Sequence, residues 1–213
     1  MVRVTDFAEL PTTTLADLLD RAQVMDIGIR PLWSPTPRVA GPAYTVRCRP
    51  GDNLMLHAAI HLAGPGSVIV VESGDLEYAL AGGNVCAVAQ RRGIAGFVLD
   101  GLIRDLAEVR DAAFPVFARG VIPIPGAKAG PEPLNTPATC GGVTVHPGDI
   151  VVADEEGVVV VPAAQQAEIA VRAKAKLAKE AAETLDDWES AHRAKIAGIL
   201  RTADHEAAAA LSR

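Results

Sequence analysis

The sequence predicts an α/β fold: a compact single domain with a long helix at its C-terminal end. Short β-branched runs alternate with segments of helical apolar spacing between residues 43 and 118. After Gly120 the chain is rich in Pro and Gly, and a strand–turn–strand pattern follows. A length of 213 residues suits one substantial core. We therefore expect an α/β domain over 1–162 and a helical extension over 163–213 that packs on the same domain or on a neighbouring subunit.

The N-terminal part should open with a helix and an extended loop. Leu15, Leu18 and Leu19 fall on one helical face, and Thr14 is the predicted N-cap. Four prolines between residues 30 and 42 predict the loop. In chain order we expect a helix over 12–25, the loop over 30–42, a strand over 43–49, a helix over 53–62 and a buried strand over 67–71.

The alternation then continues before the chain turns β-rich. We expect a helix over 84–91, a strand over 97–99, a helix over 106–112, and strands over 115–118 and 142–145. Residues 149–161 should form a hairpin that turns at Asp154-Glu-Glu-Gly157. The Ala-, Lys- and Glu-rich helix should run from Ala163 to about Leu200, with an interruption near 184–188. A purely doubly wound fold is not expected.

Composition and charge exclude several classes of function. The formal net charge of −6 argues against a nucleic-acid binder that works by phosphate neutralisation. The three cysteines are well separated and without C-x-x-C spacing, which indicates reduced thiols. No signal peptide is indicated and no apolar run is long enough to span a bilayer. We expect a cytoplasmic protein with no nucleic-acid or membrane partner.

The run from Gly93 to Asp105 is the most informative stretch. An apolar strand should end at Asp100, a glycine turn should follow, and the pair Arg104-Asp105 should open a helix. Strand ends that turn into helices are where α/β folds place their chemistry. Three charges gathered there can hold a metal ion and an organic anion together. A salt-bridged turn is the alternative.

A second candidate feature is Ala81-Gly-Gly-Asn-Val85, at the entry to a predicted helix. Glycines let backbone amides approach an anion, and a helix N-terminus favours negative charge. The run matches neither G-x-G-x-x-G nor a P-loop, so a small carboxylate suits it better than a nucleotide phosphate. Glycines that serve close packing are the alternative.

Other candidate chemistries receive less support. His57 and His61 stand four residues apart, but the glutamate of H-E-x-x-H is missing, so packed or capping histidines are expected. The lysines lie in the charged C-terminal helix or, for Lys128, in a Gly/Pro loop, and none has the apolar surroundings of a Schiff-base lysine. No G-x-S-x-G nucleophile motif occurs.

Several motifs occur together in a fixed order: Gly-Gly-Asn-Val85, Asp-Gly-Leu-Ile-Arg-Asp105, Phe-Pro-Val-Phe-Ala-Arg-Gly120, Val-His-Pro-Gly-Asp149 and Ala-Asp-Glu-Glu-Gly-Val-Val-Val-Val-Pro162. From about Thr13 to Pro162 the chain resembles the RraA-like family. This family includes divalent-metal 4-hydroxy-4-methyl-2-oxoglutarate / 4-carboxy-4-hydroxy-2-oxoadipate aldolases and the regulator of ribonuclease E activity. The resemblance implies a swivelling β/β/α fold assembled as trimers or hexamers, with sites between subunits.

The resemblance also implies roles for individual residues. Arg104 matches the arginine that binds the pyruvyl part of the substrate, and Asp105 matches the carboxylate that ligates Mg²⁺ or Mn²⁺. Asp100 resembles the acid that holds metal-bound water. Glu180 is the candidate for a water-mediated contact from a neighbouring subunit, although the sequence after it departs from the aldolases. The loop that binds substrate through its backbone amides matches Gly82, Gly83, Asn84 and Val85.

The implied function is a divalent-metal-dependent aldolase. It would cleave 4-hydroxy-4-methyl-2-oxoglutarate-type 2-keto diacids to pyruvate and decarboxylate oxaloacetate as a side activity, because both reactions pass through the pyruvate enolate. The alternatives are a non-catalytic regulator that binds and inhibits a ribonuclease, and an enzyme for a different small keto acid. This chain has the metal-binding acid, as Asp105, that regulator members can lack.

Overall fold

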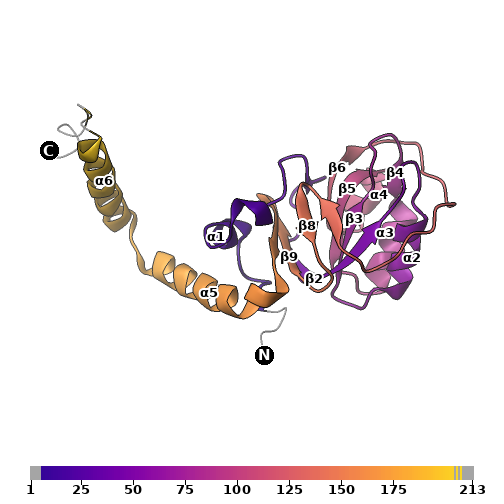
Figure 1. Cartoon of the computed structure of the whole chain (residues 1–213), viewed down its shortest axis with the longest axis horizontal. Helices are drawn as coiled ribbons and strands as arrows, with labels where there is room; N and C mark the ends of the chain where they lie inside the picture. Colours follow the sequence, from indigo (N-terminus) through magenta and orange to yellow (C-terminus); the bar gives the residue numbers. More distant parts are fainter. Residues whose placement is uncertain (1–5, 204, 206, 208–213) are drawn as a thin grey trace. The chain divides into compact units, whose positions relative to one another are not determined.

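The computed structural model describes residues 6–203, 205 and 207 (Figure 1). The chain divides into two compact units, of which the first runs to Ala173 and the second begins at Lys174. The first unit is a mixed α/β domain and holds the candidate site. The second unit consists of the end of one helix and a further helix.

The described residues of the first unit form an eight-stranded sheet. Its strands are β1 Arg30–Pro31, β2 Val39–Arg47, β3 Val68–Glu72, β4 Ala79–Ala81, β5 Gly96–Ile103, β6 Val116–Val121, β9 Ile150–Asp154 and β10 Gly157–Val161. The order is β1-β6-β5-β3-β2-β9-β10, and β4 pairs with the end of β5. The central strands β2, β3, β5 and β6 are parallel, whereas β1, β9 and β10 pair antiparallel.

Both faces of the central strands are covered. The helices α2 Leu54–Leu62, α3 Gly83–Arg91 and α4 Leu106–Asp111 share one apolar cluster with Ile69 and Val71 of β3. Val68 and Val70, which point to the opposite face, pack with the hairpin of β7 Ala138–Cys140 and β8 Val143–Val145. Burial on both faces explains why this strand reads as a continuous apolar run.

The sheet is nearly closed by the segment before β1. Val24 bridges Val159 of β10, and the Met25 N–H donates to the Val158 carbonyl at 3.0 Å. A few residues later, β1 pairs with β6 at the other edge. The segment from Val24 to Pro31 therefore connects the two edge strands and leaves little open edge.

The helix predicted over 12–25 is much shorter. The structure has α1 Thr12–Ala16, preceded by Pro11 at the N-cap, and a separate 3₁₀ turn over Arg21–Gln23. Thr14 lies inside α1, so the N-cap prediction was wrong. The physical reason is tertiary: extended pairing of Val24 and Met25 with β10 overrides the helical spacing of the leucines.

The strand predicted over 97–99 is longer than expected. β5 continues through Asp100 and Gly101 to Ile103, and its register with β6 shifts between Leu99 and Leu102. Gly101 is therefore part of a strand and not of a turn. A Cβ at Gly101 would lie 2.6 Å from Leu80 Cδ1 and 2.8 Å from Ser73 Oγ, so the glycine permits close packing.

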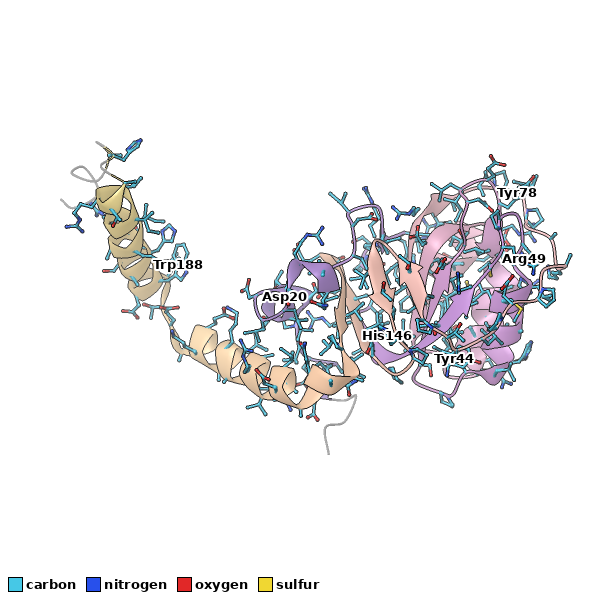
Figure 2. The ribbon with its side chains drawn as sticks, in the orientation of Figure 1. Asp20, Tyr44, Arg49, Tyr78, His146 and Trp188 are labelled. Atoms are coloured by element: carbon cyan, nitrogen blue, oxygen red, sulfur yellow. The ribbon has the colours of Figure 1, made fainter. Side chains whose placement is uncertain are left out.

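The remaining elements agree with the sequence within a few residues, except that the short strands β1, β4 and β7 were not predicted. Strand β1 and the start of β2 lie in the expected loop over 30–42. The C-terminal helix is interrupted as expected: α5 spans Gln166–Ala182, and α6 spans Leu185–Thr202 behind a capping box of Thr184 and Asp187. On α6, Trp188 stacks on His192 with ring centroids 4.6 Å apart (Figure 2). No helix among the described residues is both long and apolar enough to cross a membrane.

Candidate functional site

A small pocket opens where β4 and β5 end and the three helices of the apolar layer begin. Its volume is about 70 Å³, and its polar lining residues are Asn53, His57, Asn84, Arg104, Asp105 and Lys128. Drug-sized ligands typically occupy pockets of roughly 300–1,000 Å³, so this pocket has room for only a small ligand or for one end of it. The carboxyl ends of parallel strands are the usual place for a ligand in an α/β sheet.

Asp105 owes its orientation to an unusual backbone conformation. It follows β5 and precedes α4 with φ 57° and ψ 40°, in the left-handed region, and its side chain does not cap α4. Instead, Asp105 Oδ2 accepts the Gly83 N–H at 3.1 Å. Asp105 Oδ1 has no hydrogen-bond donor within the described part of the chain. The half-exposed carboxylate thus retains one oxygen for a ligand.

The two glycines of the Gly82–Gly83 pair make room for carboxylates. A Cβ at Gly82 would overlap Asp105 Oδ2 and lie 3.0 Å from Arg104 Cγ. A Cβ at Gly83 would overlap the carboxylate of Glu108. Close approach of side chains therefore explains both glycines, and the Gly83 amide is directed at Asp105. Gly82, Asn84 and Val85 line the pocket beside them.

Arg104 is fixed through its backbone, and its guanidinium lies beside Asp105. Its N–H donates to the Ala81 carbonyl at 2.9 Å, which joins the end of β5 to the end of β4. Its Nε lies 3.5 Å from Asp105 Oδ2, and the side chain is 42% exposed. The rest of the guanidinium fork can bind a carboxylate of a ligand.

Three polar lining residues were not predicted as site residues. Asn53 precedes α2, His57 lies on its first turn, and Lys128 lies in the loop after β6. Their i,i+4 spacing places Asn53 and His57 on one helix face, which was a usable signal. The approach of Lys128 is a tertiary contact without any local sequence signal.

His57 has a perturbed acid–base equilibrium. Burial, followed by the nearby charges of Lys128 and His61, lowers the pKa of the His57 imidazole below its usual 6.5, and only Asp52 acts in the opposite direction. The imidazole is therefore neutral at pH 7. A neutral imidazole in a pocket can accept a proton.

Asp100 lies outside the pocket lining and is engaged elsewhere. Its Oδ1 accepts a hydrogen bond from Arg119 Nε, and its Oδ2 accepts the Gly141 N–H at 2.8 Å. Arg119 also donates two hydrogen bonds to Asp26, at 2.9 and 2.8 Å. The hydrogen bond to Asp26 is the main cause that raises the pKa of Arg119, and the same bond lowers the pKa of Asp26. Asp100 is therefore not among the residues that line the pocket beside Asp105, and its predicted role at a metal-bound water stays a prediction.

Glu180 lies on the part of α5 that belongs to the second unit. Its carboxylate pairs with Lys176 one turn earlier. The lining of the pocket comes from the first unit alone. The predicted reach of Glu180 into a neighbouring site stays a prediction. His146 lies in the loop between β8 and β9 (Figure 2), and its backbone N–H donates to Asp149 Oδ2.

The donor set of the pocket suits a weakly held hard cation. The described residues contain no group of three or more His, Cys, Asp or Glu side chains arranged to hold a metal. Mg²⁺ usually keeps several waters and binds through one or two carboxylates plus its substrate. Asp105, with its unpaired Oδ1 beside the pocket, fits that pattern. A structural zinc site does not.

Comparison with known proteins places the chain in a family. Residues 12–160 match the family model described as RraA-like, Aldolase/RraA. A Halalkalibacterium halodurans protein named "Putative 4-hydroxy-4-methyl-2-oxoglutarate aldolase" is 41% identical over 180 residues, covering 84% of this chain and 85% of that protein. A Deinococcus radiodurans protein of the same name is 36% identical and covers 72% and 94% of the two chains.

The solved structures agree in fold. A Streptomyces coelicolor protein, described as an unusual member of the RNase ES inhibitor RraA protein family, superposes with a TM-score of 0.74 at 30% identity. The match covers 83% of this chain and 92% of that one. A Pseudomonas syringae protein of uncharacterized function gives a TM-score of 0.74 at 32% identity, over 83% and 84% of the two chains. With 149 consecutive residues matched by its model, this chain belongs to the RraA-like family.

Proposed function

We propose that the protein is a divalent-metal-dependent lyase that cleaves 2-keto diacids of the 4-hydroxy-4-methyl-2-oxoglutarate type to pyruvate. The observation that carries the proposal is the pairing of Arg104 and Asp105 at the rim of a small pocket with a polar lining. The names of the aldolase relatives support the same class of reaction.

Arg104 and Asp105 have complementary roles in this proposal. Arg104 binds the C1 carboxylate and the C2 oxygen through its planar fork, and it stabilises negative charge that develops on that oxygen. Asp105 would hold Mg²⁺ or Mn²⁺ through its carboxylate. When bound, the cation supplies Lewis acidity at the 2-keto oxygen. Gly82, Asn84 and Val85 form the wall against which the pyruvyl end lies.

His57 and Lys128 act at the other end of the substrate. Lys128 is the pocket cation available for the distal carboxylate. His57 accepts the proton of the C4 hydroxyl as the C4 oxygen becomes a carbonyl and the C3–C4 bond breaks. The bonding electrons move into the enolate of pyruvate, and a proton returned to C3 completes the reaction. The products are two molecules of pyruvate when the substrate carries a 4-methyl group.

The same site supports decarboxylation of oxaloacetate. Loss of CO₂ from C4 leaves the same pyruvate enolate, so Arg104 stabilises the developing negative charge of the enolate in both reactions. Decarboxylation needs no hydroxyl proton to be removed. The two reactions therefore separate the residues that act on the enolate from those that act on the C4 hydroxyl.

A ribonuclease regulator is the second candidate, favoured by the likeness to the Streptomyces coelicolor protein. A regulator of this type acts through protein contact and needs no pocket chemistry. The unpaired Asp105 oxygen and the lowered pKa of His57 favour an enzyme, because both place reactive groups on one pocket.

A pyruvate assay coupled to lactate dehydrogenase tests the proposal. We expect Mg²⁺- or Mn²⁺-dependent pyruvate release that EDTA abolishes, and a loss of at least about 100-fold in kcat/KM for Asp105→Asn. Asp111→Asn is the matched control, because Asp111 ends the short helix α4 that Asp105 precedes, and its side chain is 79% exposed. Activity that is insensitive to EDTA contradicts the metal mechanism. Inhibition of a ribonuclease without any turnover of keto diacids establishes the regulator instead.

A further inference from the structure

One buried oxygen beside the pocket has no hydrogen-bond partner. Among the described residues, the buried side-chain oxygens without a partner are Thr45 Oγ1 and Asn53 Oδ1. Thr45 lies inside the sheet on β2, away from the pocket lining. Asn53 lines the pocket and is only 3% exposed. A buried acceptor without a donor is unfavourable unless a ligand or water supplies the donor.

The backbone holds Asn53 firmly in place. Its N–H donates to the Ala127 carbonyl at 2.8 Å, and its own carbonyl accepts the His57 N–H at 3.2 Å. Its side-chain Nδ2 donates to the Ala79 carbonyl at 3.3 Å. With Nδ2 bonded to the Ala79 carbonyl, Oδ1 is the side-chain atom of Asn53 that has no partner among the described residues.

Two groups of side chains in the pocket differ in their chemistry. Arg104 and Asp105, from the end of β5, suit the anionic pyruvyl end of a keto acid. Asn53 and His57 come from the start of α2 and offer an unpaired acceptor and a neutral imidazole. Asn53 and His57 both accept protons or hydrogen bonds, so the substrate has to supply the hydrogen-bond donor on this side of the pocket.

We propose that Asn53 selects substrates that carry a hydroxyl at C4, through a hydrogen bond from that hydroxyl to Oδ1. The inference rests on the proposed function. At neutral pH, the 4-hydroxy-2-keto diacids have one hydrogen-bond donor, the C4 hydroxyl, because both carboxyl groups are ionised. The keto form of oxaloacetate has none. An acceptor placed here therefore discriminates between the two substrate types that share the enolate.

Asn53 is a specificity-determining residue and not the base. An amide oxygen is too weakly basic to take the proton, so it holds the hydroxyl when the substrate binds. The hydroxyl hydrogen then turns to His57 as the C3–C4 bond breaks. Loss of Asn53 should therefore appear mainly in KM for the hydroxylated substrate, with little change in kcat.

Steady-state kinetics with two substrates tests the assignment. We expect Asn53→Ala to raise KM for 4-hydroxy-4-methyl-2-oxoglutarate roughly threefold to tenfold, which is the effect expected from the loss of one hydrogen bond. KM for oxaloacetate should stay within about twofold. Asn53→Asp, which keeps an acceptor oxygen, should retain more of the preference. Thr45→Val is the matched control, because it removes the other unpaired oxygen, and both KM values should stay at wild type. An equal rise in both KM values for Asn53→Ala, or no rise in either, overturns the proposal.

A binding experiment separates this proposal from the proposed function. In Mg²⁺, 4-hydroxy-2-oxoglutarate should raise the melting temperature of the wild-type protein more than 2-oxoglutarate does, since the two differ only in the hydroxyl. In Asn53→Ala the difference should vanish. If the wild type releases pyruvate from no keto diacid, the proposed function is wrong. Equal stabilisation of the wild type by both compounds overturns the role of Asn53, whatever the turnover.

Discussion

At the scale of single residues, Arg119 joins Asp26 and Asp100 in one hydrogen-bonded cluster. Arg119 binds Asp26 through two hydrogen bonds and Asp100 through a third, and Asp100 also accepts the Gly141 N–H. These contacts join β5, β6, the segment before β1 and the β7–β8 turn. Because Arg119 lowers the pKa of Asp26, the ion pair contributes stability above pH 3.8, and that contribution is lost as the pH falls through the lowered pKa.

Substitution of Asp100 separates a structural role from a site role. We expect Asp100→Asn to lower the free energy of unfolding by about 1–3 kcal/mol, because a partly buried guanidinium loses a charged partner. For a chain of this size, that is a fall of several degrees in Tm. Aldolase kcat/KM should stay within about threefold. Thermal unfolding and the pyruvate assay measure both quantities. A large loss of activity at unchanged Tm would show that Asp100 takes part in catalysis.

The lowered pKa of His57 predicts a pH dependence. The imidazole has to be neutral to accept the hydroxyl proton, so kcat for 4-hydroxy-2-keto diacids should fall as the pH drops through a value below 6.5. Oxaloacetate decarboxylation should lack this acid limb. His57→Gln should remove the limb and slow the aldol cleavage about 100-fold. An NMR titration that places the pKa of His57 at or above 6.5 contradicts the assignment.

The sequence revealed some site residues and hid others for a physical reason. Arg104 and Asp105 adjoin in the chain and follow a strand, so local pattern was enough to pick them out. Asn53 and Lys128 meet only through the fold: the Asn53 N–H pairs with Ala127, the neighbour of Lys128. Asp100 seemed to end a strand because Gly101 resembles a turn residue, whereas the close contact with Leu80 is what requires a glycine there.

At the scale of elements, the junction of β4 and α3 positions the carboxylate of Asp105. Gly82 has extended backbone angles, φ −144° and ψ −172°, that any residue adopts, so its glycine identity reflects space alone. A methyl group there would overlap Asp105 Oδ2 and press on Arg104. We expect Gly82→Ala to lower kcat/KM at least about tenfold while Tm changes by no more than a few degrees.

Gly64→Ala is the control for the glycine substitution. A Cβ at Gly64, in the loop after α2, meets no atom within 4 Å, so stability and activity should both stay near wild type. The pyruvate assay and thermal unfolding compare the two variants. Wild-type kcat/KM in Gly82→Ala would show that the placement of Asp105 does not limit turnover.

Element boundaries were predictable where local pattern and packing agree. The helices α2, α3 and α4 and the hairpin of β9 and β10 lie where periodicity placed them, within a few residues. The helix expected over 12–25 ends early because Met25 pairs with Val158, a residue far along the chain. The strand β4, Ala-Leu-Ala, carries no β-branched residue, and it pairs with the extended end of β5 and, at Ala79, with Pro125.

At the scale of the whole molecule, the alternation of helix and strand predicted the parallel centre of the sheet and its helical layer. The near closure of the sheet by Val24 and Met25 depends on contacts between distant segments, which periodicity does not contain. In the second unit, α6 exposes Leu185, Trp188 and Ile199 at 76%, 50% and 55%. Large apolar side chains exposed on one helix are typical of a surface that packs against another chain.

These exposed side chains and the family resemblance lead to a prediction about assembly. We expect light scattering to give a trimer or hexamer, three or six times the mass of the 22.2 kDa chain.

If Glu180 completes the site of a neighbouring subunit, Asp105→Ala and Glu180→Ala should each lose activity alone. Refolded together, they should regain a fraction of it, because mixed oligomers contain sites with both intact residues. Glu180→Gln would keep the size of the side chain as a control for packing. Full activity of Glu180→Ala by itself, or a monomer at micromolar concentration, would contradict a shared site.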